Sequence, residues 1–325
     1  MANLHWLAAL WVALLVPCAA QADDATELQQ SLQELQANDT KLQTIGFRLA
    51  SANAPFCADQ ELSLGLQLAD VRNFSEPARI RQALHLKGDF AVEAIAAGSP
   101  AAHSRLAAGT EIATIEGEAL GAIPAAAAND NQRLNRVYDR IDAALARDGK
   151  VRIGLGSSED MVLAGVPACR SRFELLLGGN GGQADGLIAQ ISLAALLKGK
   201  VDDERAWVVA HEMAHNVLRH RARLKAIGRS IANVRDTERE ADRLTVWLMA
   251  NAGYEPKAAP VFVRNWGSKG LAGHFTTPDH DRTETRIKNI NAELAVLEKV
   301  PANAAGLRDW RFRFTPYPGE VKARP

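Results

Sequence analysis

One five-residue segment, His-Glu-Met-Ala-His at 211–215, restricts the fold more than any other part of the chain. Mostly apolar residues flank it at 206–210 and 216–218, which favours a buried helix. Residues four apart share one helix face, with Cβ atoms about 5–6 Å apart. His211 and His215 can therefore bind one Zn²⁺ together, at about 2.0–2.1 Å from each nitrogen. Glu212 is not a ligand in this arrangement, and we expect it to act as the general base.

A third ligand is expected from the segment Glu-Arg-Glu-Ala-Asp at 238–242. Catalytic zinc sites combine three protein ligands with one open position. Glu238 and Asp242 are four apart, so Glu238 is predicted to coordinate zinc and Asp242 to accept a hydrogen bond from a ligand imidazole. Glu240 is the competing third ligand, but helical periodicity directs it to a different face. Because a His-Glu-x-x-His string also occurs by chance, the downstream acidic pair is what favours a real site.

The N-terminus predicts export. Residues 7–16 are apolar, and Ala20-Gln21-Ala22 offers small residues at the two positions that a signal peptidase reads. The expected signal peptide spans residues 1–22, and the mature protein is expected in the periplasm or outside the cell, with no membrane span left after cleavage. An uncleaved membrane anchor is one alternative, which the short apolar stretch disfavours. Lipidation of Cys18 is another, which Pro17 disfavours.

Two cysteines, Cys57 and Cys169, follow the expected signal peptide. An even number of cysteines in an exported protein predicts a disulfide, with two buried free thiols as the alternative. The formal net charge of the 325 residues is zero. This balance argues against nucleic acid as a partner, because a basic surface would be needed to bind phosphates.

Hydrophobic periodicity predicts an N-terminal helical segment over 23–54, which packs onto its own chain or, less well supported, pairs as a coiled coil. Residues 55–170 alternate short apolar runs with turns; the predicted elements are strands at 90–95, 111–115 and 151–155 and a helix at 133–146, with a loop at 122–131. Residues 171–300 predict strands at 173–177 and 187–192, then helices at 203–226, 236–251, 258–266 and 280–299. Residues 301–325 predict an irregular tail.

Residues of about 173–290 resemble the zinc metallopeptidases that include HtpX, the mitochondrial Oma-type protease and the CAAX prenyl protease. The resemblance rests on four segments of this chain: 186–192, which is similar to the family's strand along the active-site cleft; 211–215 with the following Arg219-His220; 238–242 with Ala252-Gly253-Tyr254; and His280 with Arg286-Ile287. Asp281 stands where the family has a proline. The resemblance implies a peptidase, with the extended zinc motif placed as above.

The resemblance also suggests roles for the late segment. His280 is predicted to donate a hydrogen bond to the oxyanion that forms during hydrolysis. Arg286 is predicted to pair with a carboxylate such as Asp242 or Glu238 and hold the second helix in place. The alternative is a surface histidine and an ordinary helix arginine. For His220, a partly exposed helix residue is favoured over a role beside the zinc ligands.

Residues 92–101, with Leu106, Gly109, Ile112, Ile115 and Gly117, resemble a bacterial PDZ domain. Arg105 and Thr110 depart from that pattern. A PDZ domain adds a peptide as a strand to a sheet edge, so a C-terminal peptide is an expected partner. A spacer that only positions the second domain is the equal alternative.

Together these observations predict an α+β protein, in which a mainly helical, gluzincin-type domain with one zinc at 171–300 follows a small mixed-β PDZ-like domain at 55–170. The expected activity is hydrolysis of protein or peptide substrates in the cell envelope. Two other functions remain open: a catalytically silent adaptor that binds peptides, against which the intact Glu212 argues, and a zinc hydrolase with a non-peptide substrate.

Overall fold

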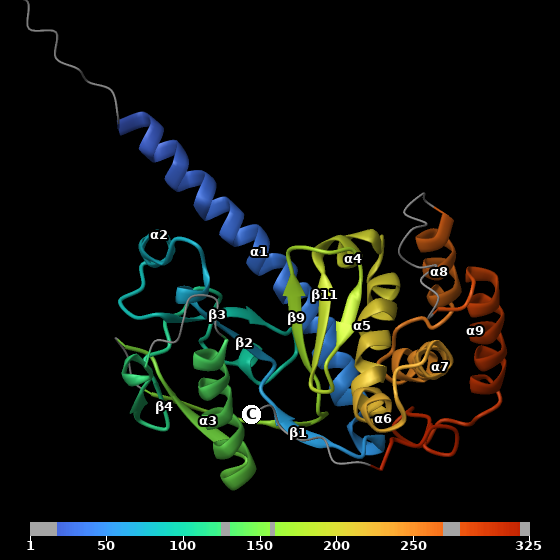
Figure 1. Cartoon of the computed structure of the whole chain (residues 1–325). Helices are drawn as coiled ribbons and strands as arrows, with labels where there is room; N and C mark the ends of the chain where they lie inside the picture. Colours follow the sequence, from blue (N-terminus) through green and yellow to red (C-terminus); the bar gives the residue numbers. More distant parts are fainter. Residues whose placement is uncertain (1–17, 125–130, 157–159, 269–279, 319–325) are drawn as a thin grey trace, which may run out of the picture.

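A computed structural model describes residues 18–124, 131–156, 160–268 and 280–318, and shows an α+β protein (Figure 1). Two large apolar clusters organise it. One lies within residues 64–163, and the other joins helix α1 to residues beyond 168. Within the described residues, no helix combines the length and the apolar character that a membrane span needs. The predicted signal peptide lies largely outside the described residues.

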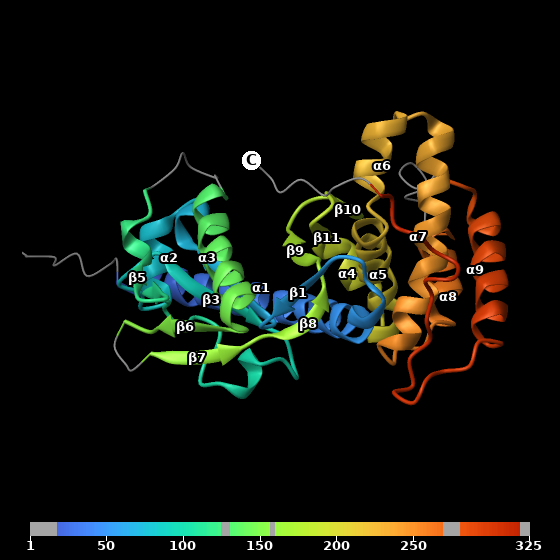
Figure 2. The ribbon, with the colours of Figure 1, turned by 90° about the horizontal axis from the view of Figure 1, so that it is seen from below.

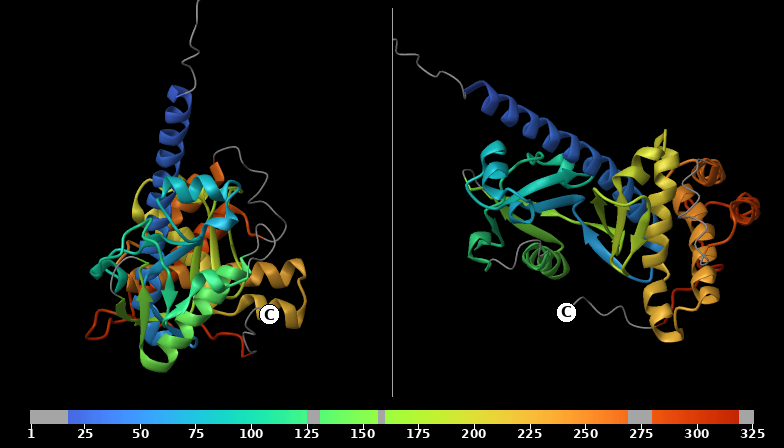
Figure 3. Two further views of the ribbon diagram at one scale, coloured as in Figure 1. Left: turned by 90° about the vertical axis from the view of Figure 1, so that its left-hand side faces the viewer. Right: turned by 45° about the horizontal axis from the view of Figure 1, so that its top comes forward.

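Helix α1 (Cys18–Asn53) crosses the whole molecule and contacts both halves (Figures 1 and 3). Leu42, Ile45 and Leu49 are almost fully buried in the cluster of the C-terminal half. Nearer the N-terminus, Leu32 packs with Val71 and Ile80 of the N-terminal half. The predicted helix is therefore confirmed, and it packs on its own chain because its apolar positions find partners there.

The N-terminal half is a small mixed-β module. Its strands are β2 (Leu66–Asp70), β3 (Phe90–Ile95), β4 (Thr114–Ile115), β5 (Glu118–Ala119), β6 (Lys150–Gly154) and β7 (Met161–Ala164), and its helices are α2 (Pro77–Ala83) and α3 (Gln132–Asp148). The strands form a β2-β3 pair and a β5-β4-β6-β7 sheet. Helix α3 buries Val137, Ile141 and Leu145 against them (Figure 2). Gly149 ends α3 in the left-handed conformation that glycine adopts without strain.

The sequence predicted this module only in part. The strands at 90–95 and 151–155 and the helix at 133–146 are present within two residues of their predicted ends. The strand expected over 111–115 is wrong for most of its length, because regular pairing covers only Thr114–Ile115 and Glu111 makes a single bridge to Ala91. Strands β2 and β7 were not predicted. Most of the predicted loop at 122–131 lies outside the described residues.

The junction between the halves is a two-stranded ladder closed by a disulfide. Strand β1 (Gln60–Ser63) pairs antiparallel with β8 (Val166–Cys169), with Gln60 opposite Cys169. The predicted disulfide between Cys57 and Cys169 is confirmed. Both ends of the module are thus fixed at one place, beside the C-terminal half.

The C-terminal half builds helices around a small sheet. Its strands β9 (Arg172–Leu176), β10 (Gly182–Ala184) and β11 (Ile188–Ser192) run in the order β10-β11-β9. The helices are α4 (Leu193–Lys198), α5 (Asp202–Val217), α6 (His220–Ile227), α7 (Ile231–Asn251), α8 (Ala258–Ser268) and α9 (Thr283–Leu297). Helix α5 packs between the sheet and α7, while α6 and the start of α7 project as a hairpin (Figure 2). Short 3-10 helices lie at Ala54–Phe56, Val71–Asn73, Ala101–His103 and Leu120–Ala122.

Three helix predictions need correction. The helix expected over 236–251 begins five residues earlier, at Ile231. The helix expected over 203–226 is broken after Val217, because Arg219 adopts a left-handed conformation with φ of 56°. The helix expected from residue 280 begins only at Thr283, so His280 precedes it. The tail has no helix or strand over 301–318, as predicted, and it buries Trp310 and Phe314 in the C-terminal cluster.

Candidate metal centre

The three predicted ligands meet where α5 packs against α7. Nε2 of His211 lies 3.3 Å from Nε2 of His215 and 3.1 Å from Oε2 of Glu238. Nε2 of His215 lies 3.5 Å from the same carboxylate oxygen. These residues form a group that could hold a metal ion. The i, i+4 spacing on a helix places both imidazoles on the side of α5 that faces α7.

The geometry fits a small tetrahedral ion. Ligand atoms about 2.0–2.1 Å from a tetrahedral zinc are separated by roughly 3.3 Å from one another. The three observed separations, 3.1, 3.3 and 3.5 Å, lie close to that value. The donor set of two imidazoles and one carboxylate is one that zinc accepts in catalytic sites. The group opens on one side into a cleft of about 630 Å³.

Charge at the group also indicates a cation site. Burial raises the pKa of Glu238, but His215, His211 and His280 together hold that pKa well below its usual range. Burial lowers the pKa of His211, yet Asp242 and Glu238 outweigh burial and raise that pKa to about 10. The carboxylates therefore carry negative charge in a buried place, where either the protonated His211 or a bound metal ion compensates it.

Glu212 lies beside the group, in the wall of the cleft. It is only 8 % exposed, and burial raises the pKa of its carboxyl group. A raised pKa suits a general base, because the protonation equilibrium then lies nearer neutral pH. Gly182 of β10 approaches it so closely that a Cβ atom at Gly182 would lie 2.6 Å from Cγ of Glu212. The glycine therefore lets a strand edge pass directly over the predicted base.

Arg286 pairs with Asp242, as predicted, and the Asp242 carboxylate lies next to the His211 ring. Arg286 donates two hydrogen bonds to the Asp242 carboxylate, at 2.8 and 2.7 Å. Oδ1 of Asp242 lies 3.1 Å from Nδ1 of His211, although this buried Nδ1 does not meet hydrogen-bond geometry in the present ring orientation. Burial opposes the charge on Asp242, but Arg286 and His211 lower its pKa below the ordinary value. The carboxylate is thus held in place behind the ligand ring.

His220 corrects the sequence prediction, because it is buried and not a partly exposed helix residue. Its side chain is next to His215, with Nδ1 of one ring 2.9 Å from Nδ1 of the other. Nε2 of His220 lies 3.2 Å from Oε2 of Glu240, which also accepts a 2.7 Å bond from Arg223. Burial lowers the pKa of His220 to about 4. Glu240 is therefore occupied away from the metal group, as its helical position predicted.

His280 reaches the group from the chain before α9. Its Nε2 lies 3.1 Å from Oε2 of Glu238, and it lines the same cleft as Glu212. It is not one of the three converging ligands. Burial lowers the pKa of His280, but the Glu238 carboxylate outweighs burial and raises it. The predicted role as an oxyanion donor stays a prediction.

The strand along the cleft is β10, not the segment 186–192 as the resemblance implied. Strand β11 pairs with β10 on one side and with β9 on the other, so it lies in the middle of the sheet. Strand β10 pairs with β11 alone in the described sheet, and all three of its residues line the cleft. Glycines around Gly178–Gly182 carry no regular period, which is why the sequence indicated only a turn there.

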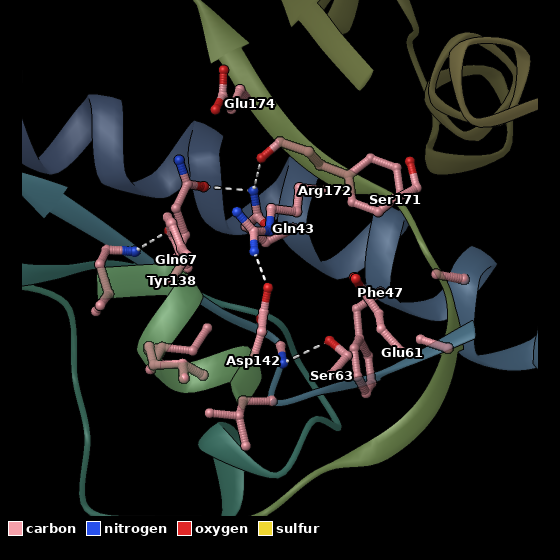
Figure 4. Close-up of a pocket in the computed structure, with 18 of the residues that line it drawn as sticks. Gln43, Phe47, Glu61, Ser63, Gln67, Tyr138, Asp142, Ser171, Arg172 and Glu174 are labelled. Carbon is pink, nitrogen blue, oxygen red and sulfur yellow. Dashed lines mark hydrogen bonds and ion pairs between the residues drawn. The ribbon is translucent and has the colours of Figure 1, made fainter. Parts of the chain in front are cut away.

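The sequence predicted a peptide groove in the module without placing it, and in the structure the chain's own side chains cross the region between β2 and α3. A cavity of about 340 Å³ lies between β2 and α3, with α1 and β9 as its other walls (Figure 4). The Leu68 N–H at the free edge of β2 donates to the Tyr138 hydroxyl at 2.9 Å. Arg172 from β9 pairs with Asp142 and stacks over the Tyr138 ring, 4.6 Å from its centroid.

Helix α1 completes this closure. Nε2 of Gln43 lies 2.5 Å from Oε1 of Gln67 and 2.7 Å from the Phe173 carbonyl oxygen, which ties α1 to β2 and to β9 (Figure 4). An added peptide strand needs the free backbone groups of an edge. Here one of those groups is already bonded, and residues from the other half cover the approach.

No family model matches the chain, and no curated protein matches it.

Proposed function

We propose that the protein is a zinc-dependent peptidase, similar to the family that the sequence resembles. The observation that carries the proposal is the convergence of His211, His215 and Glu238 at tetrahedral separations beside an open cleft. Glu212 lies in the same cleft without joining the ligand group. Three ligands, one open side and an adjacent carboxylate are the arrangement of a catalytic zinc site rather than a closed structural one.

Each side chain has a role in this proposal. His211, His215 and Glu238 hold the metal; bound zinc supplies the acidity that water needs at neutral pH and a positive charge for the substrate carbonyl. Glu212 takes the proton as water attacks and passes it to the departing amine. Asp242, fixed by Arg286, keeps the His211 ring oriented. Because Glu212 is buried, its carboxyl group can keep the proton between the attack of water and the departure of the amine.

A peptide substrate is favoured by the free edge of β10. An extended chain can bind such an edge through backbone hydrogen bonds, which suits proteins of differing sequence. The cleft beyond this edge is lined by Trp207, Val208 and Phe262, which suit an apolar side chain. A non-peptide substrate would make no use of the strand edge.

The test is digestion of casein by the purified chain, with and without a chelator. Glu212→Gln should keep the metal and lose hydrolysis by about 10²–10⁴-fold, since the proton acceptor alone is removed. Glu238→Ala should lose the metal as well. Glu204→Gln, on the same helix but outside the cleft, is the matched control and should digest normally. Wild-type rates in Glu212→Gln would show that the mechanism is wrong.

We further propose that the module is a spacer and does not bind peptides, and that the protein acts after export, in the periplasm or outside the cell. The contacts of Tyr138, Arg172 and Gln43 favour the spacer over a free peptide binder. The disulfide favours an oxidising compartment.

A further inference from the structure

The break between α5 and α6 brings a second histidine to the candidate metal centre. In an unbroken helix, residues five apart point about 140° away from one another. The left-handed Arg219 turns the chain instead, so that the rings of His215 and His220 lie 4.9 Å apart between centroids. Residues other than glycine rarely adopt such a φ, because their Cβ atom makes this conformation strained.

The strained turn is held by contacts from distant segments. Arg219 donates to both carboxylate oxygens of Asp59, at 2.7 and 2.6 Å, and to the Tyr317 carbonyl oxygen at 3.2 Å. The Tyr317 N–H donates to the Leu218 carbonyl oxygen. One segment before the turn in the sequence and one after it thus fix the turn. As a result, His220 is only 1 % exposed.

The proton arrangement around His220 follows from chemistry. A neutral imidazole that binds a metal through Nε2 carries its proton on Nδ1. The Nδ1–H of His215 then donates a hydrogen bond to Nδ1 of His220, 2.9 Å away. His220 can accept it only if its own proton is on Nε2, and that nitrogen faces Glu240 at 3.2 Å. One set of tautomers therefore satisfies every partner in the chain from metal ligand to carboxylate.

We propose that His220 is a positioning residue of the metal centre. It accepts a hydrogen bond from Nδ1–H of His215 and donates one from Nε2–H to Glu240, which fixes the orientation of the His215 ring. The proposal rests on the proposed metal site. Under this proposal the two imidazole ligands are oriented in similar ways. Behind each ring lies a carboxylate that an arginine holds in place. His211 uses Asp242 and Arg286, while His215 uses His220, Glu240 and Arg223.

The expected effect is on metal affinity. Partners of this kind change metal affinity or activity by about 10–100-fold when they are replaced. His220→Phe keeps a flat ring but cannot accept a proton, so it should bind zinc about 10–100-fold more weakly. His220→Asn places an oxygen near the position of Nδ1 and should restore most of the affinity. Lys225→Ala, an exposed residue of the same helix, is the control and should match the wild type.

The experiment is competition between the full chain and a chelator of known affinity, followed by the visible spectrum of the cobalt-loaded protein. Weaker binding and an altered cobalt spectrum in His220→Phe, with recovery in His220→Asn, support the proposal. Equal zinc affinity in wild type and His220→Phe overturns it. If His220→Phe does not fold, Glu240→Ala replaces it, with a loss of about 10-fold expected.

Two controls separate this proposal from its neighbours. Thermal unfolding of the metal-free variants detects a merely structural role, because that role lowers stability without a selective loss of metal affinity. A wild-type chain that binds no zinc would overturn both the proposed function and the positioning role of His220. If the wild type binds zinc and digests casein, and His220→Phe binds zinc with the same affinity, only the positioning role of His220 is overturned.

Discussion

Removal of the Cys57–Cys169 disulfide should destabilise the protein without disabling the metal centre. The cross-link joins residues 112 apart in the sequence. In the chain-entropy model a loop of that length is worth about 5 kcal/mol at 25 °C, because the bond restricts the unfolded chain. Both cysteines are buried in the C-terminal cluster, so part of the loss in an alanine variant is packing.

The assay is urea and thermal unfolding of the wild type, both single alanine variants and the double variant. A loss of this size should lower the unfolding temperature by on the order of 10 °C. Either single replacement should cost nearly as much as both, since one missing sulfur already opens the loop. Zinc content and hydrolysis at room temperature should persist, because neither cysteine lines the cleft.

Three results would refute this reasoning. Equal unfolding midpoints for oxidised and reduced wild type would show that the closed loop does not restrict the unfolded chain. Alkylation of both cysteines in the unreduced native protein would show that the bond is absent. Costs that add fully between the single variants would point to packing instead of loop closure.

Three further predictions concern His280, the groove and pH. His280→Ala should lower turnover by about 10²–10³-fold with zinc content unchanged, if it donates to the oxyanion; normal turnover would make it a bystander, and zinc loss would make it a ligand. The full chain should bind no C-terminal peptide in calorimetry, whereas Tyr138→Phe with Arg172→Ala should bind weakly; binding by the wild type would reject the spacer. Burial raises the pKa of Asp39 to about 7 and that of Glu93 to about 8, and each has a buried oxygen without a hydrogen bond. Because the folded state prefers these carboxyls protonated, their contribution to stability should fall as pH rises from about 4 to 8. Asp39→Asn with Glu93→Gln should raise the unfolding temperature at pH 8 but not at pH 4, and an equal rise at both would contradict this.

Local spacing in the sequence was enough to identify the candidate metal ligands. His211 and His215 share a helix face by periodicity alone, and the same rule pairs Glu238 with Asp242 on α7. A buried apolar flank then dictates that two such helices face each other. The disulfide also followed from counting, since only two cysteines remain after the expected signal peptide.

The tertiary structure decided the features that depend on distant contacts. His220 reaches His215 only because Arg219 takes a left-handed conformation, and that conformation is fixed by Asp59 and Tyr317, far away in the chain. An arginine gives no sequence signal for such a turn, whereas a glycine would.

Strand β10 and the cavity between β2 and α3 both depend on contacts between segments that are distant in the sequence. Strand β10 is only three residues long and follows a glycine-rich turn, so no hydrophobic period marks it. Its pairing with β11 is what makes it a strand. Arg172 and Gln43 lie outside the β2–α3 region in the sequence. They contact Asp142 and Gln67 beside the cavity only once the two halves have packed together. Periodicity in a sequence reports which face of an element is buried, but the neighbour that buries it is chosen by the whole fold.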